Sequence, residues 1–474
     1  MMNPRNDKFL DPKTSPSSFR DRSGFVFFRD FQLYRQINND YGDTYEALIG
    51  SGLYNELIRK RSLIEHEEVS IGHALSDDVY KVIKPRLIPF ISYPYEWCFS
   101  QYKNAALLTL EIQITALEYG MSLKDASAYN IQFIDCKPVL IDTLSFEKYT
   151  EGKPWVAYRQ FCQHFLAPLA LICYRDVRLG QLMKVFIDGL PLDLVSGLLP
   201  FRTKMKFSLL FHIHLHSRAQ KRFSDKGFNE EKRRISRIGF ISIIDSLKSA
   251  VQSLNWDPEK TVWSAYYDKT NYTERGFAHK REIVSIFLDE ILDEIKDAKT
   301  LWDFGSNVGE FSRIAASKRL QTISFDADPN VVEENYHKAV REGEKNLLPL
   351  LCDLTNPSPD IGWESRERSS LLQRGPADIV LALAVIHHLA ISNNVPLSRL
   401  AKFFSSMCEA LIIEFIPKSD TRVQKLLSTR QDIFIDYNQE CFEYEFKNYF
   451  SVLNSITVKD SERSIYLMRR LKPV

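Results

Sequence analysis

Residues 300–311 read TLWDFGSNVGEF, and this stretch decides the fold of the second half of the chain. Leu301 to Phe304 is typical of a buried strand, and a helix is expected to begin near Glu310. Between them lies the turn Gly305-Ser-Asn-Val-Gly309. Its two glycines allow the backbone to turn sharply and approach a ligand closely, while the N–H groups of the first helical turn face that ligand. The stretch therefore predicts a turn that holds a nucleotide-like ligand.

Asp303, which stands two residues before the turn, narrows the class of ligand. The glycine spacing is G-x-x-x-G, which differs from the G-x-G-x-x-G turn that binds the pyrophosphate of a dinucleotide. A carboxylate at this position can accept a hydrogen bond from an ammonium group, which a methionyl tail has and a pyrophosphate lacks. We therefore expect a ligand with an ammonium group at this turn.

A second predicted strand, Thr322 to Phe325, ends in the acidic sequence Asp326-Ala-Asp328. Asp326 lies 21 residues after Gly305. That distance returns the chain through one helix to a neighbouring strand end, where a carboxylate can accept hydrogen bonds from both hydroxyls of a ribose. The sequence therefore predicts a ribose site at Asp326, with Asp328 as a second candidate.

Three more predicted strands complete a sheet. Leu348 to Cys352 ends in Asp353-Leu354, where a carboxylate can meet the exocyclic amine of an adenine, and Ala377 to Ala382 and Ala410 to Phe415 follow. Strands that alternate with helices form an α/β fold with a doubly wound, Rossmann-like parallel sheet, and ligands bind at the carboxyl ends of its strands. The C-terminal segment predicts a helix and two strands, which add an antiparallel edge to that sheet.

From about Lys280 to Val474 this constellation resembles the class I S-adenosylmethionine-dependent methyltransferases. The resemblance implies that the cofactor is S-adenosyl-L-methionine and assigns one part of it to each motif. Its methionine moiety would contact Asp303, Gly305, Asn307 and Gly309, its ribose Asp326 or Asp328, and its adenine Asp353 and Leu354.

His387 and His388 follow the fourth predicted strand, where this superfamily often places residues that face the substrate. A histidine there could take a proton from a hydroxyl, an amine or an activated carbon while the nucleophile attacks the methyl group. Alternatively, one of the two packs in the core or caps the next helix. Methyl transfer to an already acidic nucleophile needs no strong base, so positioning alone could suffice.

The second informative stretch is Met121 to Phe146, in which a loop with Asp125 and Asn130 leads to a short strand pair and then to Asp142. Two carboxylates and an amide from adjacent loops can hold magnesium and phosphate. The pattern resembles the catalytic loop and metal-binding aspartate of protein-kinase-like and aminoglycoside-phosphotransferase-like folds. The resemblance implies Asp125 as base, Asn130 and Asp142 as magnesium ligands, and Mg-ATP as a cofactor if this domain is active.

Departures from that pattern favour a kinase-like scaffold without transfer activity, or simply a polar turn. Leu123 stands where such kinases have histidine, and Thr143-Leu144 replaces Phe-Gly after the metal aspartate. Gly24 is the only glycine in the candidate phosphate loop, and no strand lysine that would pair with phosphates can be identified.

The rest of the N-terminal half predicts an α+β domain. A hairpin over Gly24 to Ile37, helices within Tyr45 to Arg61, and a strand-like segment broken by prolines precede a helix over Cys98 to Tyr119. We expect an unstructured leader over 1–20, the kinase-like domain over 21–220, a charged linker or helix over 221–255, and the methyltransferase domain over 256–474.

Two other features have alternative explanations. His212, His214 and His216 alternate, so on a strand they would share one side and could bind a metal, although packing is the commoner role of such histidines. Four aromatic residues before the second domain could cover a ligand pocket or pack between domains: Trp263, Tyr266, Tyr267 and Tyr272.

The composition is that of a globular protein of two domains in 474 residues. Lys+Arg 62 against Asp+Glu 61 gives no overall field that would concentrate nucleic acid or an anionic membrane, so a nucleic-acid partner is unsupported. The seven scattered cysteines suggest reduced thiols, and no apolar run is long enough to span a membrane. We expect a cytoplasmic protein.

The arrangement as a whole resembles a family of bacterial methyltransferases related to rhizobial nodulation host-specificity proteins. The supporting stretches include SGFVFFRD, LKDASAYN, YRQFCQHFLAPLAL and RSIYLMRR. We expect methyl transfer to a small-molecule or glycan-like acceptor, whose site the kinase-like domain would shape. The alternatives are a bifunctional kinase-methyltransferase and a non-catalytic protein that senses adenosylmethionine or assembles partners. The sequence fixes neither the acceptor atom nor the oligomeric state.

Overall fold

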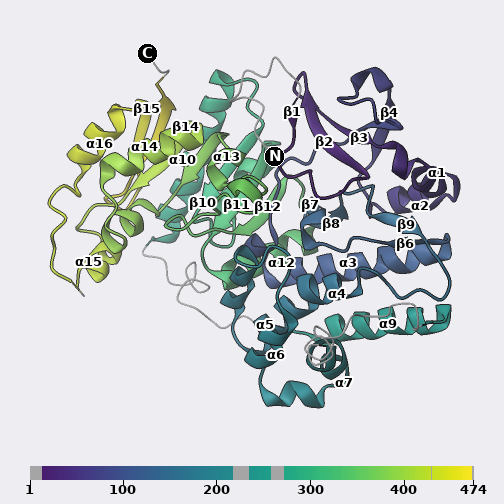
Figure 1. Cartoon of the computed structure of the whole chain (residues 1–474). Helices are drawn as coiled ribbons and strands as arrows, with labels where there is room; N and C mark the ends of the chain where they lie inside the picture. The colour runs from purple at the N-terminus through teal and green to yellow at the C-terminus, as the bar shows by residue number, and fades with distance from the viewer. Residues whose placement is uncertain (1–12, 217–233, 258–271, 429, 472–474) are drawn as a thin grey trace. The chain divides into compact units, whose positions relative to one another are not determined.

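The structure, a computed structural model, describes residues 13–216, 234–257, 272–428 and 430–471. These residues form two compact units, whose helices and strands are labelled in Figure 1. The first unit runs to Asp257 and also takes in the short segment Asp360–Arg368, while the second contains the rest of the chain from Pro258 onward. No helix in the described part of the chain is long and apolar enough to cross a membrane.

The first unit begins with an antiparallel sheet in the order β1-β2-β3-β5-β4. The predicted hairpin is confirmed, and its turn is made by Asp30 and Phe31, both with positive φ angles. The five strands are β1 (Lys13–Thr14), β2 (Gly24–Arg29), β3 (Gln32–Ile37), β4 (His66–Val69) and β5 (Lys81–Pro85).

The expectation of an unstructured leader is wrong for residues 13–20. β1 pairs with β2, and the N–H of Ser15 donates to the carbonyl of Val26 at 2.8 Å. The N–H of Val26 in turn donates to Ser18 Oγ at 2.8 Å. Hydrogen bonds to a sheet edge thus order a segment whose low apolar content had indicated disorder.

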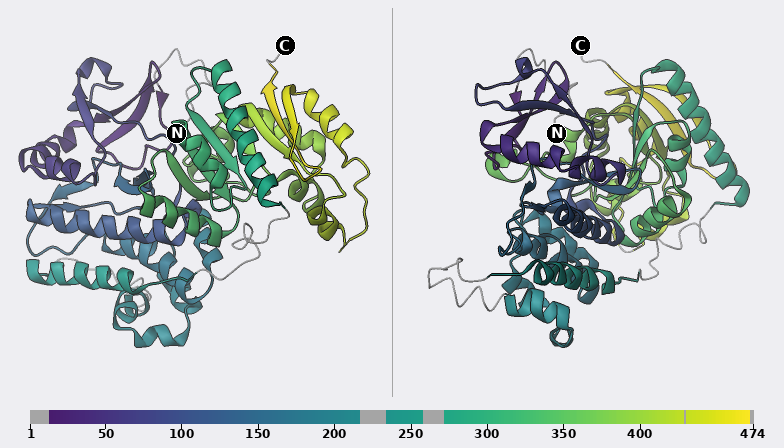
Figure 2. Two further views of the ribbon diagram at one scale, coloured as in Figure 1. Left: turned by 180° about the vertical axis from the view of Figure 1, so that it is seen from behind. Right: turned by 90° about the vertical axis from the view of Figure 1, so that its right-hand side faces the viewer.

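Helices α1 (Gly42–Gly50) and α2 (Leu53–Arg59) follow the hairpin, and α3 (Phe99–Glu118) matches the predicted long helix. Helix α9 (Arg237–Ser253) lies alongside α3, as both views of Figure 2 show. Lys103 Nζ of α3 donates to the carbonyls of Gln252 at 3.0 Å and Leu254 at 2.7 Å. Of the two alternatives for residues 221–255, a charged linker or a helix, the described part is therefore a helix packed within the first unit.

Two small antiparallel sheets come after α3. One joins β6 (Met121–Leu123) to β9 (Phe146–Lys148), and the other joins β7 (Ile131–Ile134) to β8 (Lys137–Leu140). The loop with Asp125 and Asn130 lies between β6 and β7, and Asp142 follows β8 as predicted.

The next part of the first unit is helical. Its elements are α4 (Tyr158–Phe161), η5 (Cys162–Leu166), α5 (Ala167–Tyr174), η6 (Val177–Lys184), α6 (Leu192–Leu198), η7 (Phe201–Met205), α7 (Phe207–Leu209) and η8 (Leu210–Leu215).

His212 and His214 lie in the helical segment η8 and His216 follows it, so these three residues are not on a strand that would have gathered them around a metal. His212 bonds Tyr158 Oη at 2.8 Å and Ser246 Oγ at 2.9 Å. His214 bonds Ser196 Oγ at 2.8 Å. Both imidazoles are buried and act as packing residues with hydroxyl partners.

The second unit is built on a seven-stranded sheet in the order β12-β11-β10-β13-β14-β16-β15. The first five strands are parallel, and β16 and β15 form the antiparallel edge, so the doubly wound fold is confirmed. The strands are β10 (Thr300–Phe304), β11 (Gln321–Asp326), β12 (Leu347–Leu351), β13 (Ala377–Ala382), β14 (Cys408–Phe415), β15 (Phe450–Thr457) and β16 (Ser464–Arg470).

Helices cover this sheet. All six residues of β13 are buried, as expected for a strand with neighbours on both sides and helices on both faces. The helices of the unit are α10 (Glu274–Glu294), α11 (Glu310–Ser317), α12 (Pro329–Glu342), α13 (Leu371–Arg374), α14 (Leu397–Met407), α15 (Thr421–Leu427) and α16 (Gln439–Lys447). Trp263, Tyr266 and Tyr267 lie outside the described residues.

Candidate active site

A cavity of about 620 Å³ opens at the carboxyl ends of the parallel strands of the second unit. Nine of the ten residues predicted for this half of the chain line it, and Gly309 is the exception. The nine are Asp303, Gly305, Asn307, Asp326, Asp328, Asp353, Leu354, His387 and His388. The topology brings them together because each predicted acidic position lies at or just beyond the carboxyl end of a strand.

Gly305 and Gly309 have different roles in the turn. Gly305 has a φ of +70°, and a Cβ atom there would stand 2.4 Å from Cγ2 of Val385, so only glycine fits. Gly309 has a φ of +80° at the start of α11, and a Cβ would stand 2.6 Å from the Asn335 amide. Gly309 therefore shapes the turn from behind and does not face the cavity.

Asp303 is a buried carboxyl at the end of β10. It accepts a hydrogen bond from Ser312 Oγ at 2.5 Å. Burial raises the pKa of Asp303 to about 7; the nearby Asp326 acts in the same direction, while Ser312 and Lys280 oppose the rise. The carboxyl consequently titrates near neutral pH, and a positively charged ligand group would favour its ionised form.

Asp326 connects the turn to β11. Its Oδ2 accepts the N–H of Asn307 at 2.8 Å, and its Oδ1 accepts the N–H of Asp328 at 2.9 Å. Burial raises the pKa of Asp326 to about 6, although these backbone donors oppose the rise. Each carboxylate oxygen can accept a second hydrogen bond.

Asp328 serves chiefly as the N-terminal cap of α12. Its Oδ1 accepts the backbone N–H of Asn330 at 2.9 Å and the side-chain amide of Asn330 at 2.8 Å. This geometry favours Asp326 over Asp328 as the ribose residue. Asp353 organises the turn after β12, because its Oδ1 accepts the N–H and the hydroxyl of Thr355 at 2.8 and 2.7 Å.

His387 and His388 lie beside each other, with ring centroids 4.1 Å apart. His387 is 2% exposed, and its buried Nδ1 has no hydrogen-bond partner within the described structure. Burial lowers the pKa of His387 well below its usual value, and burial lowers that of His388 to about 4; the positive charge of Arg422 acts in the same direction on both. Both imidazoles are therefore neutral at physiological pH.

A buried charge network that spacing did not reveal adjoins the cavity. Lys280 Nζ forms an ion pair with Glu414 at 2.7 Å, Tyr272 Oη donates to the same carboxylate, and Arg463 Nη1 lies 3.9 Å from it. Arg463 Nε also pairs with Asp420 at 2.7 Å. Tyr272, Lys280 and Arg463 line the cavity, so one of the four aromatic residues expected near a pocket is found there.

One sequence signal could have identified Lys280. The buried positions of α10 recur three and four residues apart, at Gly276, Lys280, Ile283, Val284 and Phe287. A lysine on the apolar face of a helix is unusual, because burying its charge requires a partner. Glu414, 134 residues away, could not be assigned as that partner from the sequence.

Basic residues line a further part of the cavity. They come from α15 and the segment after it, namely Arg422, Lys425 and Arg430. Arg430 Nη1 donates to the carbonyl of Ile391 at 2.6 Å. Within the described residues, no ion pair is found for Lys425 or Arg430. The cavity is thus acidic where β10, β11 and β12 end and basic beside α15.

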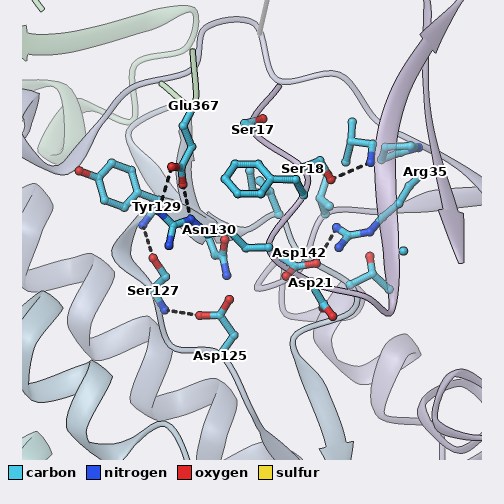
Figure 3. A pocket seen from close by; sticks show the side chains of 18 of the residues that line it. Ser17, Ser18, Asp21, Arg35, Asp125, Ser127, Tyr129, Asn130, Asp142 and Glu367 are labelled. Atoms are coloured by element: carbon cyan, nitrogen blue, oxygen red, sulfur yellow. Dashed lines mark hydrogen bonds and ion pairs between the residues drawn. The ribbon is translucent and has the colours of Figure 1, made fainter. Parts of the chain in front are cut away.

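Asp125, Asn130 and Asp142 meet in a second cavity, of about 400 Å³, within the first unit (Figure 3). Asp142 Oδ1 forms an ion pair with Arg35 Nη1 of β3 at 2.5 Å. The same carboxylate accepts the N–H of Leu144 at 3.0 Å and Ser145 Oγ at 2.7 Å. A strand cation, Arg35, therefore pairs directly with Asp142.

Asp125 is also occupied by protein donors. Its Oδ1 accepts the N–H of Ser127 at 2.9 Å and the amide of Gln160 at 2.7 Å. Burial raises the pKa of Asp125, and the neighbouring Asp142 raises it further. No cluster of three or more metal-binding side chains occurs among the described residues. The ion pair with Arg35 already neutralises the negative charge of Asp142, which a magnesium ion would need in its ligand. The side chains of this cavity therefore do not fit magnesium.

The segment Asp360–Arg368 contributes to the same cavity. Glu367 accepts two hydrogen bonds from the guanidinium of Arg20, at 2.7 and 2.9 Å. Arg368 lies over the ring of Tyr129, 4.4 Å from its centroid, next to Asn130. Residues that follow β12 in the chain therefore complete a wall that residues 1–220 alone would leave open, which the sequence did not indicate.

No family model matches the chain. The nodulation protein NoeA of Rhizobium meliloti (strain 1021) is 34% identical over 468 residues, which cover 97% of this chain and 96% of that protein. Magnesium protoporphyrin IX methyltransferase (ChlM) from Synechocystis PCC 6803, solved with bound SAH, matches 44% of this chain and 93% of its own at 18% identity and a TM-score of 0.31.

Two more solved methyltransferases match part of the chain. The bifunctional kinase-methyltransferase WbdD matches 43% of this chain and 41% of its own, at 15% identity and a TM-score of 0.30. The N-methyltransferase NodS from Bradyrhizobium japonicum WM9 matches 41% of this chain and 98% of its own, at 11% identity and a TM-score of 0.29.

Proposed function

We propose that this chain, which belongs to the family of the nodulation protein NoeA, transfers a methyl group from S-adenosylmethionine to a small-molecule or glycan-like acceptor. The observation that carries the proposal is the cavity of the second unit. There a glycine turn, a buried carboxyl before it and a carboxylate at the end of the next strand face one space. Each of these groups suits a different part of that one cofactor.

The residues present fit the cofactor. Asp303 would bind the ammonium group of the methionyl tail. Because Gly305 has no side chain, the tail would lie close to the backbone of Gly305. Asp326 has an unused acceptor site on each oxygen for the ribose hydroxyls. Asp353 and Leu354 would contact the adenine. When bound, the cofactor supplies a methyl group on a positively charged sulfur.

The acceptor would lie against His387. Its neutral imidazole, with a partnerless buried Nδ1, would take the proton that an acceptor hydroxyl or amine loses as its oxygen or nitrogen forms the new bond to carbon. Arg422, Lys425 and Arg430 would bind polar or anionic groups elsewhere on the acceptor.

Label transfer tests this proposal. The full chain is incubated with a cell extract and methyl-labelled adenosylmethionine, and label in small molecules is measured. We expect transfer by the wild type and none by Asp326→Ala. Saturable cofactor binding without any transfer would instead indicate a sensing or assembly protein.

We further propose that the first unit is a kinase-like domain that helps to present the acceptor and does not transfer phosphate. Its antiparallel sheet, long helix α3, catalytic-loop residues and Asp142 after a hairpin support the kinase-like assignment. The ion pair between Arg35 and Asp142, at 2.5 Å, argues against bound magnesium.

A melting experiment distinguishes this proposal from the alternative of a bifunctional kinase-methyltransferase. A ligand that binds only the folded state raises the melting temperature. If the first unit is a kinase, Mg-ATP should raise the melting temperature of the wild type but not that of Asp142→Asn. We expect no magnesium-dependent shift in either protein, and a shift lost in Asp142→Asn would establish the bifunctional alternative.

A further inference from the structure

Residues 201–207, with the sequence FRTKMKF, present large apolar side chains to solvent on the first unit. The exposed fractions are 74% for Phe201, 82% for Met205 and 77% for Phe207. Single exposed apolar residues are ordinary on a protein surface, but three within seven residues form a patch that calls for an explanation.

Basic residues alternate with these apolar residues. Lys204 lies over the ring of Phe201, 5.2 Å from its centroid, while Arg202 and Lys206 lie over the ring of Tyr174 at 5.7 and 5.3 Å. Between residues 192 and 216 the sequence contains a single acidic residue, Asp193. The FRTKMKF surface is therefore both apolar and positively charged.

The inner side of this segment is fixed by buried polar contacts. Thr203 is buried, its Oγ1 donates to the carbonyl of Pro200 at 2.7 Å, and it also bonds His214 Nε2 at 3.0 Å. His214 bonds Ser196 Oγ through its other ring nitrogen. One of the alternating histidines thus holds η7 in place, so the exposure of Phe201, Met205 and Phe207 is a property of a fixed surface.

The apolar character extends to neighbouring helices. Further exposed large apolar side chains come from α6 and η8, namely Leu194, Leu198, Phe211 and Leu215. Phe207 and Phe211 stack with ring centroids 6.4 Å apart. α6 and α7 lie at the end of the first unit opposite its five-stranded sheet (Figure 1).

We propose that the FRTKMKF surface binds the headgroup region of an anionic membrane. Large apolar side chains interleaved with Lys and Arg are the composition that inserts at the boundary between headgroups and acyl chains. A protein partner is less well matched, because lysine is depleted in the cores of protein interfaces. A second copy of the chain would bring like charges together. The overall charge near zero does not oppose this local attraction, which acts within about 10 Å at moderate salt.

Co-sedimentation with vesicles tests the inference on the full chain. The two vesicle types are phosphatidylcholine alone and phosphatidylcholine with phosphatidylglycerol in equal parts. We expect binding to the anionic vesicles that weakens at high salt and little binding to the neutral ones. Each basic residue near such a surface contributes about fivefold to the binding constant, so R202Q/K204Q/K206Q should lose about a hundredfold.

The apolar contribution is tested with F201S/M205S/F207S, which should bind anionic vesicles at least about tenfold more weakly. A matched control is I433S/I435S, which removes two apolar residues of the second unit that are 64% and 83% exposed. The control should bind vesicles like the wild type. Apart from the half-buried Lys204, the substituted side chains are exposed, so the melting temperature should change little.

Three results would overturn the proposal. The first is a wild type that does not sediment with anionic vesicles. The second is retained binding in both FRTKMKF variants. The third is a wild-type dimer in solution that F201S/M205S/F207S converts to a monomer without any vesicle binding, which would make the surface a contact between copies. Cofactor binding by the second unit should be unchanged in every variant.

Discussion

At the scale of single residues, burial sets the chemistry of Asp303. A carboxyl surrounded by protein holds its proton more tightly than one in water, and Asp303 reaches a pKa of about 7. A ligand ammonium beside it would return it to the ionised form. In the proposed function, Asp303 would therefore couple cofactor binding to proton release.

This coupling predicts that adenosylmethionine affinity rises with pH through about 7. Below its pKa, Asp303 must lose a proton before it binds the ammonium, so the affinity falls up to tenfold per pH unit. Calorimetric titrations at several pH values should show this slope in the wild type. Asp303→Asn should bind more weakly and retain only the dependence near pH 6 that comes from Asp326. An equal slope in both proteins would contradict the assignment.

The stability of the cofactor-free chain should respond to pH in the opposite sense. The folded-state pKa of Asp303 lies above the unfolded value, so the protonated form stabilises the fold, and this stability is lost as pH rises from about 4 to about 7. Chemical denaturation at several pH values should show the loss in the wild type. Asp303→Asn should show less of it.

Gly305 allows a second test at this scale, with Gly343 as its matched control. Both have positive φ, +70° and +63°, but a Cβ at Gly343 would meet nothing within 4 Å, whereas at Gly305 it would meet the β-branched Val385. Gly343→Ala should cost about 1 kcal/mol of backbone strain. Gly305→Ala should cost about 2 kcal/mol more through crowding and should weaken cofactor binding. Equal unfolding free energies for the two variants would contradict the role given to Val385.

At the scale of elements, the pair of Lys280 from α10 and Glu414 from β14 anchors a helix beside the cavity. Both side chains are almost fully buried, at 4% and 0% exposure. Removing one partner of a buried ion pair leaves an uncompensated charge, which costs more than the pair itself contributes.

We predict that Lys280→Met lowers the free energy of unfolding by about 3 kcal/mol and that Lys280→Met/Glu414→Leu recovers part of the loss. The control is Lys318→Met, which breaks the pair with the solvent-exposed Asp289 at 2.6 Å and should cost less than about 1 kcal/mol. Chemical denaturation measures all three. A loss in Lys280→Met no larger than that in Lys318→Met would show that the network does not anchor α10.

The elements themselves could be predicted wherever local pattern dominates. The strands of the second unit and the helix α3 follow from apolar runs and periodicity, and the predicted bounds agree within a few residues. For the alternating histidines, packing, given as the commoner role, is the alternative found, because their segment winds into η8 and gains hydroxyl partners from distant helices. The spacing of residues in the sequence alone cannot show where tertiary contacts decide the local structure.

At the scale of the whole molecule, the cavity residues that follow strand ends were predictable, because a doubly wound sheet gathers strand ends by topology. Residues that long-range contacts bring to the cavities could not be predicted. Examples are Lys280 with Glu414 and Glu367 with Arg20. In the first unit, sequence spacing identified Asp142 but could not reveal that Arg35 neutralises it. A charge partner from a distant element therefore decides whether such a carboxylate is free to bind a cation.

The most direct test of the central claim is a calorimetric titration of adenosylmethionine into the full chain. The account predicts one saturable site. Asp326→Ala should weaken the site at least about tenfold through loss of the ribose hydrogen bonds, and Asp142→Asn, in the other unit, should leave it unchanged. Absence of binding by the wild type, or equal affinity of the wild type and Asp326→Ala, would contradict the account.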